Sequence, residues 1–246
     1  MTAEGAFALD DLAAEFANKL TALTRGVLGE DSPQFHAVNA GSRIRVSPIS
    51  DTERVHRIPI TIGGQPRLSL MACYYCCWDG SSTFLATDKA NLHLFYEKGS
   101  EPLLRFEYER TWTDPPGAHI QVHAHRDEMA YLLRLADSGR PGFAMKRDKL
   151  PRLAEMHLPV GGHRMRPSLE DVLLFLEREF SIDTRPGWRA VVEEHLVDWR
   201  LMQMKSAVRD APEEAAETLR LLGYTVEPPK VVRPRTERDV TKLFLP

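Results

Sequence analysis

The residues with the clearest chemical potential are three histidines in the stretch from Ala118 to Asp127, A-H-I-Q-V-H-A-H-R-D. In a β-strand successive side chains point to opposite faces, so His119, His123 and His125 would share one face of a sheet. Imidazole titrates near neutral pH, which suits general acid–base catalysis and metal binding. This stretch is the strongest candidate for a site, although a solvated sheet face with incidental histidines fits the same spacing.

The strand candidates that precede this stretch carry residues that could join its polar face. In the strand predicted over 103–110, Arg105 and Glu107 alternate with apolar residues. In the strand predicted over 92–97, His93 would point to the opposite face from its two leucine neighbours. Such a set can cleave RNA without a metal, because a base takes the 2′-hydroxyl proton, an acid protonates the leaving oxygen and a cation holds the phosphate. We expect the catalytic group to comprise His119, His123, His125, Arg105 and Glu107. In it, His123 and His125 would act as acid and base, and His119 would orient them.

A metal site is an alternative use of the same histidines. Together with a carboxylate such as Glu107 they could hold Zn²⁺ or another divalent ion, which would make the protein a metal-dependent hydrolase. Cys73 and Cys76 would point to opposite faces of a strand and could not chelate one ion without a bend. Clustered cysteines in an apolar strand are usually core residues. We therefore expect no metal or other cofactor.

A second candidate site is the loop from His157 to Arg166, H-L-P-V-G-G-H-R-M-R, which leads into a helix that Ser168 opens. Its spacing is not that of a P-loop, and the Lys-Ser/Thr pair is missing. A substrate phosphate could nevertheless be held by the helix N-terminus together with Gly161, Gly162, His163, Arg164 and Arg166. The alternative is a turn and a cap that fix the entry of the helix, with the arginines in solvent. Taken alone, the loop favours that alternative.

The order of predicted elements indicates an α+β fold, because a helix is followed by a run of strands and then by a run of helices. Apolar periodicity predicts helices over 8–28, 127–138, 168–180, 186–210 and 212–223. Strands are predicted over 43–46, 55–62, 68–78, 83–87, 92–97, 103–110 and 119–125, and residues 30–42 are expected to form a loop. Short turns between successive strands favour antiparallel pairing. We expect an N-terminal helix, a curved antiparallel sheet of five to seven strands and a C-terminal helical segment packed on one face.

Two parts of one compact unit are expected, a sheet domain over residues 1–166 and a helical segment over 167–246. The long helix of the second part carries a stripe that includes Trp188, Trp199, Met202 and Met204. Such a stripe is usually core, but if exposed it would be a partner surface. A non-catalytic protein-interaction module is therefore an alternative function.

Composition narrows the class of protein. A net charge of −3 on 246 residues gives no general basic field for nucleic acid, so any RNA contact would come from local patches. The N-terminus shows no secretory signal, and no apolar run approaches the roughly 18 residues of a membrane span. The three cysteines lie in one apolar stretch, which is not a disulfide framework. We expect a cytoplasmic protein without a membrane partner.

The segment from His119 to Phe180, about a quarter of the chain, resembles the TumE-type toxins of bacterial toxin–antitoxin modules. In that family a His-x-His strand of a short antiparallel sheet precedes a Leu-rich helix that ends in Asp/Glu-Phe. The matching pieces are His123-Ala124-His125-Arg126-Asp127-Glu128 and Ser168-Leu169-Glu170-Asp171-Val172-Leu173 through Glu179-Phe180. The resemblance implies a growth-inhibiting toxin that acts on RNA and has a cognate antitoxin protein as its partner. With the histidine face, it predicts a toxin-like ribonuclease.

Overall fold

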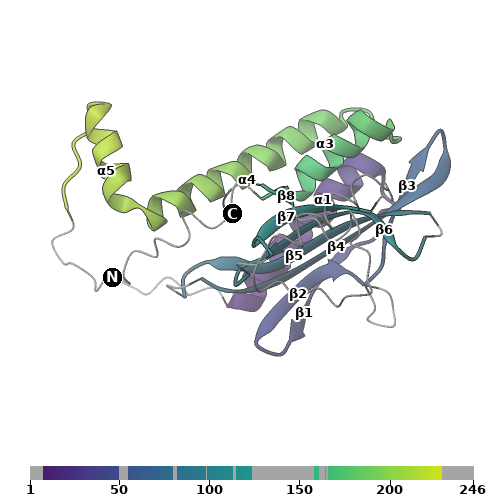
Figure 1. Ribbon diagram of the computed structural model, residues 1–246, viewed down its shortest axis with the longest axis horizontal. Helices are drawn as coiled ribbons and strands as arrows, with labels where there is room; N and C mark the ends of the chain where they lie inside the picture. The colour runs from purple at the N-terminus through teal and green to yellow at the C-terminus, as the bar shows by residue number, and fades with distance from the viewer. Residues whose placement is uncertain are drawn as a thin grey trace, which may run out of the picture.

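The computed structural model of the chain describes residues 8–49, 55–79, 82–97, 99–112, 115–123, 158–160, 164 and 166–228. Its elements are α1 (Leu9–Leu28), β1 (Phe35–Ala40), β2 (Arg43–Pro48), β3 (Ile58–Ile62), β4 (Gln65–Trp78), β5 (Leu85–Tyr96), β6 (Pro102–Glu109), β7 (Ala118–Val122), β8 (Leu158–Pro159), α3 (Leu169–Phe180), α4 (Trp188–Asp210) and α5 (Pro212–Leu221). Figure 1 shows the helices α1, α3 and α4 beside the sheet and α5 at the far end of α4. The expected α+β fold is confirmed. The helix expected over 127–138 lies outside the described residues.

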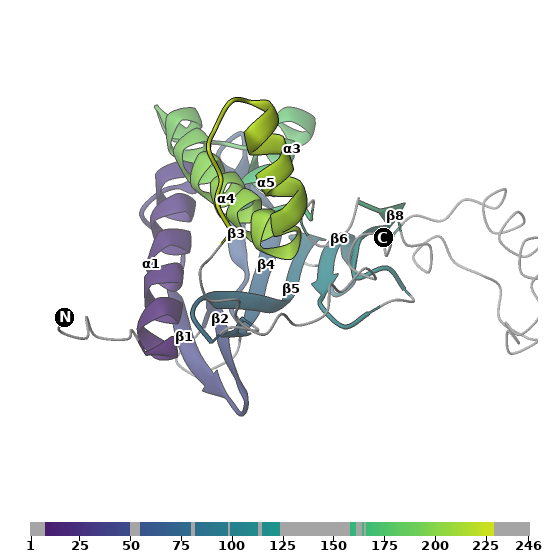
Figure 2. The same cartoon turned by 90° about the vertical axis from the view of Figure 1, so that its left-hand side faces the viewer.

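The strands form one antiparallel sheet along the path β1-β2-β4-β5-β6-β7-β8, with β3 paired to β4 beside this path. Both β2 and β3 pair with the same edge of the long strand β4. β2 pairs with residues 74–76 of β4, and β3 pairs with residues 65–70. The sheet is curved and open (Figure 2). Three details differ from expectation: β1 lies in a segment expected to be a loop, β5 is one continuous strand where two were expected, and the short strand β8 was not predicted.

Helix α1 covers one end of the sheet through an apolar side that includes Ala13, Ala17 and Leu23, all buried. The ring of Phe16 packs edge-on against the ring of Tyr74 on β4, with centroids 5.2 Å apart. The hydroxyl of Thr21 accepts a hydrogen bond of 2.9 Å from the backbone amide of Phe35, which ties the start of β1 to the helix. The sheet therefore turns the side of β4 that carries Tyr74 toward the helices.

The C-terminal helices continue this cover. Ser168 and Asp171 form the reciprocal capping box that the sequence predicted: the Ser168 hydroxyl accepts from the Asp171 amide, and the Asp171 carboxylate accepts from the Ser168 amide. The ring of Phe175 on α3 meets the ring of Phe106 on β6 edge-on, with centroids 5.9 Å apart. Among the described residues, no helix is long and apolar enough to cross a membrane.

These contacts divide the sheet into two faces. Tyr74, Phe106 and Tyr108 belong to the face that packs against the helices, since all three are buried with the core. Successive residues of a strand alternate between faces, so Glu107 and Glu109 point to the opposite side. The name "polar face" is used below for that opposite side of β4 to β7, and the predicted histidine face is part of it.

Candidate active site

Four strands bring three of the five predicted catalytic residues together in two neighbouring rows on the polar face. Cross-strand pairing gives one row of Cys73, Asn91, Glu107 and His119. The next row is Met71, His93, Arg105 and Gln121. His123 follows Gln121 by two residues and extends the pairing, because its amide donates to the carbonyl of Leu103 at 2.9 Å. The structure thus places Arg105, Glu107, His119 and His123 on one face, as their alternation predicted.

Glu107 is the centre of this group. Its Oε1 lies 2.6 Å from Nε2 of His93, and its Oε2 lies 3.3 Å from Nε2 of His119. Burial by itself would raise the pKa of Glu107, but the hydrogen bonds from His119 and His93 and the charge of these imidazoles outweigh burial and hold the pKa well below its usual value. Glu107 is therefore ionised at neutral pH, and each imidazole donates to it from Nε2.

His119 is fixed from several directions. Its side chain is fully buried at 0% exposure, and Nδ1 lies 2.7 Å from the carbonyl oxygen of Pro116. That carbonyl and the Glu107 carboxylate are both acceptors, so each ring nitrogen of His119 lies against a hydrogen-bond acceptor. The indole of Trp112 stacks on the imidazole with centroids 6.0 Å apart. A fully buried ring cannot touch a substrate, so in any active site at this face His119 could act only by positioning Glu107.

His123 and Arg105 have a different environment. Burial, and after it the positive charge of Arg105, lowers the pKa of His123 below its ordinary value, so this imidazole is neutral near pH 7. Nε2 of His123 and Nε of Arg105 are buried and have no hydrogen-bond partner within the described part of the chain. Buried polar atoms without partners are rare in proteins, so these two nitrogens mark an unusual polar environment. A neutral imidazole next to a guanidinium is suited to accept a proton near a bound anion.

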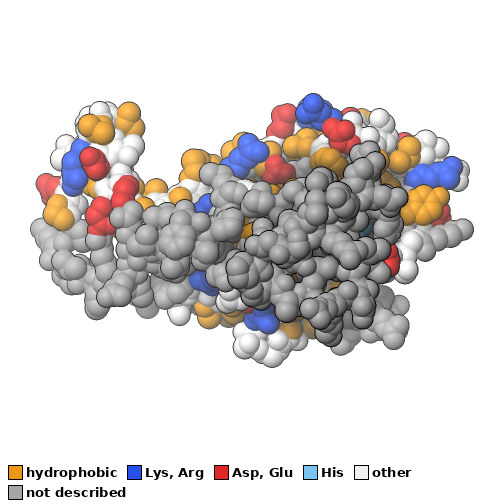
Figure 3. All heavy atoms as spheres, in the orientation of Figure 1, with side chains coloured by type: hydrophobic (Ala, Val, Ile, Leu, Met, Phe, Trp, Pro, Cys, Tyr) orange, Lys and Arg blue, Asp and Glu red, His pale blue; other side chains and the backbone are white. Residues whose placement is uncertain are grey.

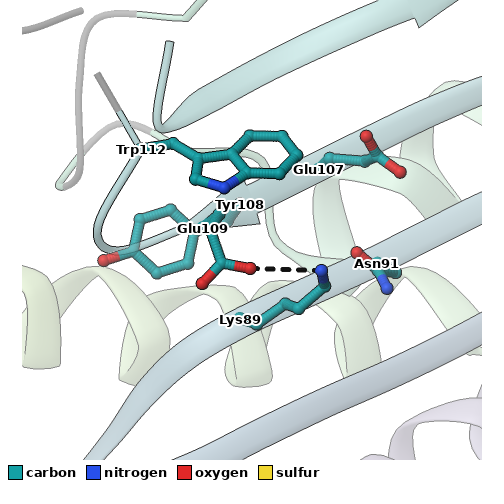
Figure 4. Close-up of a pocket in the computed structure, with 6 residues that line it drawn as sticks. All are labelled: Lys89, Asn91, Glu107, Tyr108, Glu109 and Trp112. Atoms are coloured by element: carbon teal, nitrogen blue, oxygen red, sulfur yellow. Dashed lines mark ion pairs between the residues drawn. The ribbon is translucent and has the colours of Figure 1, made fainter. Parts of the chain in front are cut away.

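A small pocket lies beside Glu107 in the same face (Figure 4). Its volume is about 60 Å³, and it is lined by Lys89, Asn91, Glu107, Tyr108, Glu109 and Trp112. In Figure 4 the indole of Trp112 lies over the carboxylate of Glu109, which forms an ion pair of 3.1 Å with Lys89. Pockets that enclose small-molecule ligands usually measure about 300–1,000 Å³. This pocket is therefore too small to enclose such a ligand.

The arginines of the predicted phosphate loop are not part of the polar face. Arg164 donates from Nε and Nη2 to the carboxylate of Asp210 on α4, at 2.8 and 2.6 Å. Arg166 is buried on the helix side, with its guanidinium 4.3 Å from the ring centre of Tyr108 and 4.7 Å from that of Trp199. The structure therefore does not bring these two arginines to the histidines. The remaining predicted residues, His125, Gly161, Gly162 and His163, lie outside the described residues.

Several residues of the site were not assigned to it from sequence. His93 was recognised only as a possible companion, yet it makes the shortest contact with Glu107. Lys89 and Asn91 precede it at intervals of two, and this alternation with Ala90 and Leu92 was the signal that could have identified all three. Trp112 lies in the turn after β6, where no periodic pattern marks it.

A metal centre finds no support in the described part of the chain. No group of three or more His, Cys, Asp or Glu side chains there is arranged to hold a metal ion. Cys73 lies in the polar face opposite Asn91, whereas Cys76 is buried in the core on the helix side. The two thiols therefore point to opposite faces, and burial raises the pKa of Cys76 to about 12, which disfavours the thiolate that binds metals.

Comparison with known protein families, with curated proteins and with solved structures found no match to this chain. The assignment of a function therefore depends on the chemistry of the polar face and on the resemblance carried by the sequence.

Proposed function

We propose that the protein is a metal-independent ribonuclease whose active site is the polar face around Arg105. The observation that carries the proposal is the position of Arg105 in relation to two imidazoles. Arg105 pairs directly with His93 across β5 and β6, and its charge is second only to burial in lowering the pKa of His123. A cation beside one carboxylate-bound imidazole and one neutral imidazole is the set of groups that RNA transphosphorylation needs.

The proposed reaction uses these groups in three roles. His123 accepts the proton of the 2′-hydroxyl, and the 2′-oxygen attacks the adjacent phosphorus. The bond from phosphorus to the 5′-oxygen breaks, and His93 donates the proton that this leaving oxygen takes. Arg105 binds the phosphate oxygens whose negative charge increases in the transition state. The products are a 2′,3′-cyclic phosphate and a free 5′-hydroxyl, and neither a metal nor an oxidant takes part.

Glu107 and His119 support this reaction without touching the substrate. Glu107 accepts from Nε2 of His93 at 2.6 Å, which leaves Nδ1 as the atom of His93 that exchanges a proton with RNA. His119 holds the second oxygen of Glu107 and is itself held by Pro116. This chain of contacts fixes the orientation of the His93 ring, in the way that a carboxylate orients a catalytic histidine.

The exposed group beside the site that could meet RNA is Trp112. The pocket of about 60 Å³ is too small to enclose a nucleotide, so a bound base would lie outside it. Trp112 is 37% exposed beside the site, and aromatic side chains of this kind stack with bases of single-stranded nucleic acid. Such stacking tolerates any base, so the expected cleavage shows only modest sequence preference.

The test is cleavage of single-stranded RNA by the purified full chain and by His93→Gln, His123→Ala and Arg105→Gln variants. Each substitution is expected to reduce the rate by roughly 10²-fold or more, as loss of a general acid, base or anion contact usually does. Matched controls are His36→Ala, on the exposed start of β1, and Arg178→Gln, on the exposed side of α3. Both controls should retain the wild-type rate.

Two further measurements define the chemistry. A substrate with 2′-deoxyribose at the cleaved position should resist cleavage, and a chelator should leave the rate unchanged. Cleavage that stops with the chelator would support the metal-dependent hydrolase instead. A wild-type protein inert on RNA, or equal rates in wild-type and variant proteins, would reject the ribonuclease.

The resemblance to TumE-type toxins supports a narrower form of the proposal, in which the ribonuclease is a cytoplasmic toxin restrained by a cognate antitoxin protein. Induced expression in bacteria should then arrest growth, and the His93→Gln and His123→Ala variants, produced at equal levels, should not. Unimpaired growth with active wild-type enzyme would reject the toxin while leaving the ribonuclease in place. Equal arrest by wild-type and variant proteins would favour the alternative of a non-catalytic interaction module.

A further inference from the structure

The outer side of α4 carries a stripe of apolar residues that the fold leaves exposed. It consists of Val197, Leu201, Met204 and Val208, which are 57%, 44%, 57% and 51% exposed. Their spacings alternate between four and three residues, as do the a and d positions in the seam between two coiled-coil helices. These four residues are called the α4 seam below.

The α4 seam faces away from the rest of the molecule. Trp199, whose ring lies under the guanidinium of Arg166, marks the side of α4 that packs on the body. Val197 and Leu201 are each two residues from Trp199, which is about 200° around a helix. In Figure 3 apolar side chains alternate with charged ones along the upper edge of the molecule, where Figure 1 places α4. The α4 seam therefore contributes nothing to the core of its own chain.

We propose that the α4 seam is a homodimer interface, in which it packs against the α4 seam of a second copy running antiparallel. A two-fold axis between Met202 and Gln203 places Leu201 of one copy beside Met204 of the other, and Val197 beside Val208. In coiled-coil terms Val197 and Met204 are d positions, and Leu201 and Val208 are a positions. Antiparallel helices pair a with d, so the two-fold arrangement fills every layer.

The charges beside the α4 seam decide between an antiparallel and a parallel pair. Asp198 and Lys205 occupy e positions, which face each other in antiparallel coiled coils, so each Asp198 meets Lys205 of the other copy. In a parallel pair, g positions would face e positions of the other copy. Arg200 would then meet Lys205, and Glu193 would meet Asp198, so both contacts would join like charges. Charge complementarity therefore selects the second copy in the antiparallel direction.

The length of the α4 seam sets the strength of the dimer. Twelve residues, from Val197 to Val208, span about 18 Å of helix, which is short for a coiled coil. The interface is then at the small end for protein complexes, where association is reversible. The dimer should therefore dissociate on dilution. This proposal is independent of the ribonuclease activity, because the α4 seam contains no residue of the polar face.

The test is sedimentation velocity of the full chain over a series of concentrations. Wild-type protein should shift from monomer to dimer as concentration rises. Leu201→Glu should raise the dissociation constant at least about tenfold, as loss of a central apolar contact does. The matched control is Tyr96→Glu, which places the same charge at a residue 53% exposed at the end of β5. Thermal melting by circular dichroism of each variant confirms that the monomer is folded.

A charge-reversal cycle tests the direction of the helices. In the antiparallel dimer Lys205→Glu and Asp198→Lys should each weaken association by roughly three- to tenfold, since two ion pairs become repulsive, and the double variant should restore it. In a parallel dimer each single reversal would tighten association. The proposal would be overturned by a protein that stays monomeric at every concentration or by a dimer whose dissociation constant Leu201→Glu does not change. Single charge reversals that tighten the dimer would also overturn it.

Discussion

Glu107 on β6 and His119 on β7 face each other directly across the sheet, with Oε2 of the carboxylate 3.3 Å from Nε2 of the imidazole. The histidine is fully buried and its other nitrogen is already bound to Pro116, so the pair can change neither position nor partners easily. The consequence is a carboxylate held ionised within the sheet. That carboxylate in turn holds His93, the only one of its two imidazole partners with any exposure to solvent.

The first prediction concerns the pH dependence of stability. The pKa of Glu107 is lower in the folded protein than in the unfolded chain, where it is about 4.5, so the unfolded chain binds the proton more readily. The stabilisation from Glu107 is complete above the unfolded value and is lost as the pH falls toward the folded one. Glu107→Gln should lower the free energy of unfolding by about 2 kcal/mol at pH 7 and by less at acid pH.

Urea denaturation of wild-type and Glu107→Gln proteins at neutral pH and near pH 4 checks this prediction. Glu15→Gln is a control, because Glu15 pairs with Lys19 on the exposed side of α1. A difference between wild-type and Glu107→Gln proteins that stays constant over this range of pH would contradict it.

The second prediction concerns His123. Burial and the charge of Arg105 both lower its pKa, in that order. Arg105→Gln removes the second cause and should raise the pKa of His123 toward its ordinary value, whereas Arg105→Lys retains the charge and should leave it low. NMR titration of the imidazole protons measures this, with the His123→Ala variant identifying the resonance. An unchanged or lower pKa in Arg105→Gln would show that the guanidinium does not act on this ring.

Parity along each strand was sufficient to predict which residues share the polar face. The expectation that Arg105, Glu107, His119 and His123 share one side needed only alternation and short antiparallel connections. Alternation alone does not predict the register, that is, which residues of neighbouring strands face each other. Whether Arg105 or Glu107 would meet His119 depends on the turn from 110 to 117 and its backbone contacts, such as the bond from the Glu109 amide to the Gly117 carbonyl. No local pattern encodes that register.

Burial of polar residues was less accessible to sequence analysis. The sequence predicts Arg166 to be either a solvated loop residue or a phosphate ligand, because a basic residue in a Gly-rich segment is usually one or the other. Its position between Tyr108 and Trp199 depends on two aromatic residues more than thirty positions away in the chain. The stripe on α4 was likewise expected to be core. In the structure only Val192 of α4 is fully buried, and Met202 and Met204 are exposed.

The third prediction concerns the close contact of α1 and α4. A Cβ atom at Gly26 would lie 2.8 Å from Cγ1 of Val191, so Gly26→Ala should destabilise the protein by about 1–3 kcal/mol despite the higher helix propensity of alanine. In a Val191→Ala background the clash is absent, and the same substitution should instead stabilise by up to about 1 kcal/mol. Thermal unfolding of the four proteins in this cycle gives both values. Destabilisation of equal size in the two backgrounds would mean that Val191 is not the obstacle.

The fourth prediction concerns Arg166, which joins the sheet to α4 by stacking between Tyr108 and Trp199. A lysine keeps the charge, but its compact ammonium cannot lie flat between two rings and is more strongly hydrated than a guanidinium. Arg166→Lys should therefore reduce the free energy of unfolding by about 1–3 kcal/mol, since each cation–π contact of a desolvated cation contributes up to about 2 kcal/mol. Arg209→Lys is the matched control, because Arg209 lies over a single exposed ring, that of Phe84. Denaturant unfolding should show a clear loss of stability for Arg166→Lys and little change for Arg209→Lys, and equal effects would refute a special role for the buried stack.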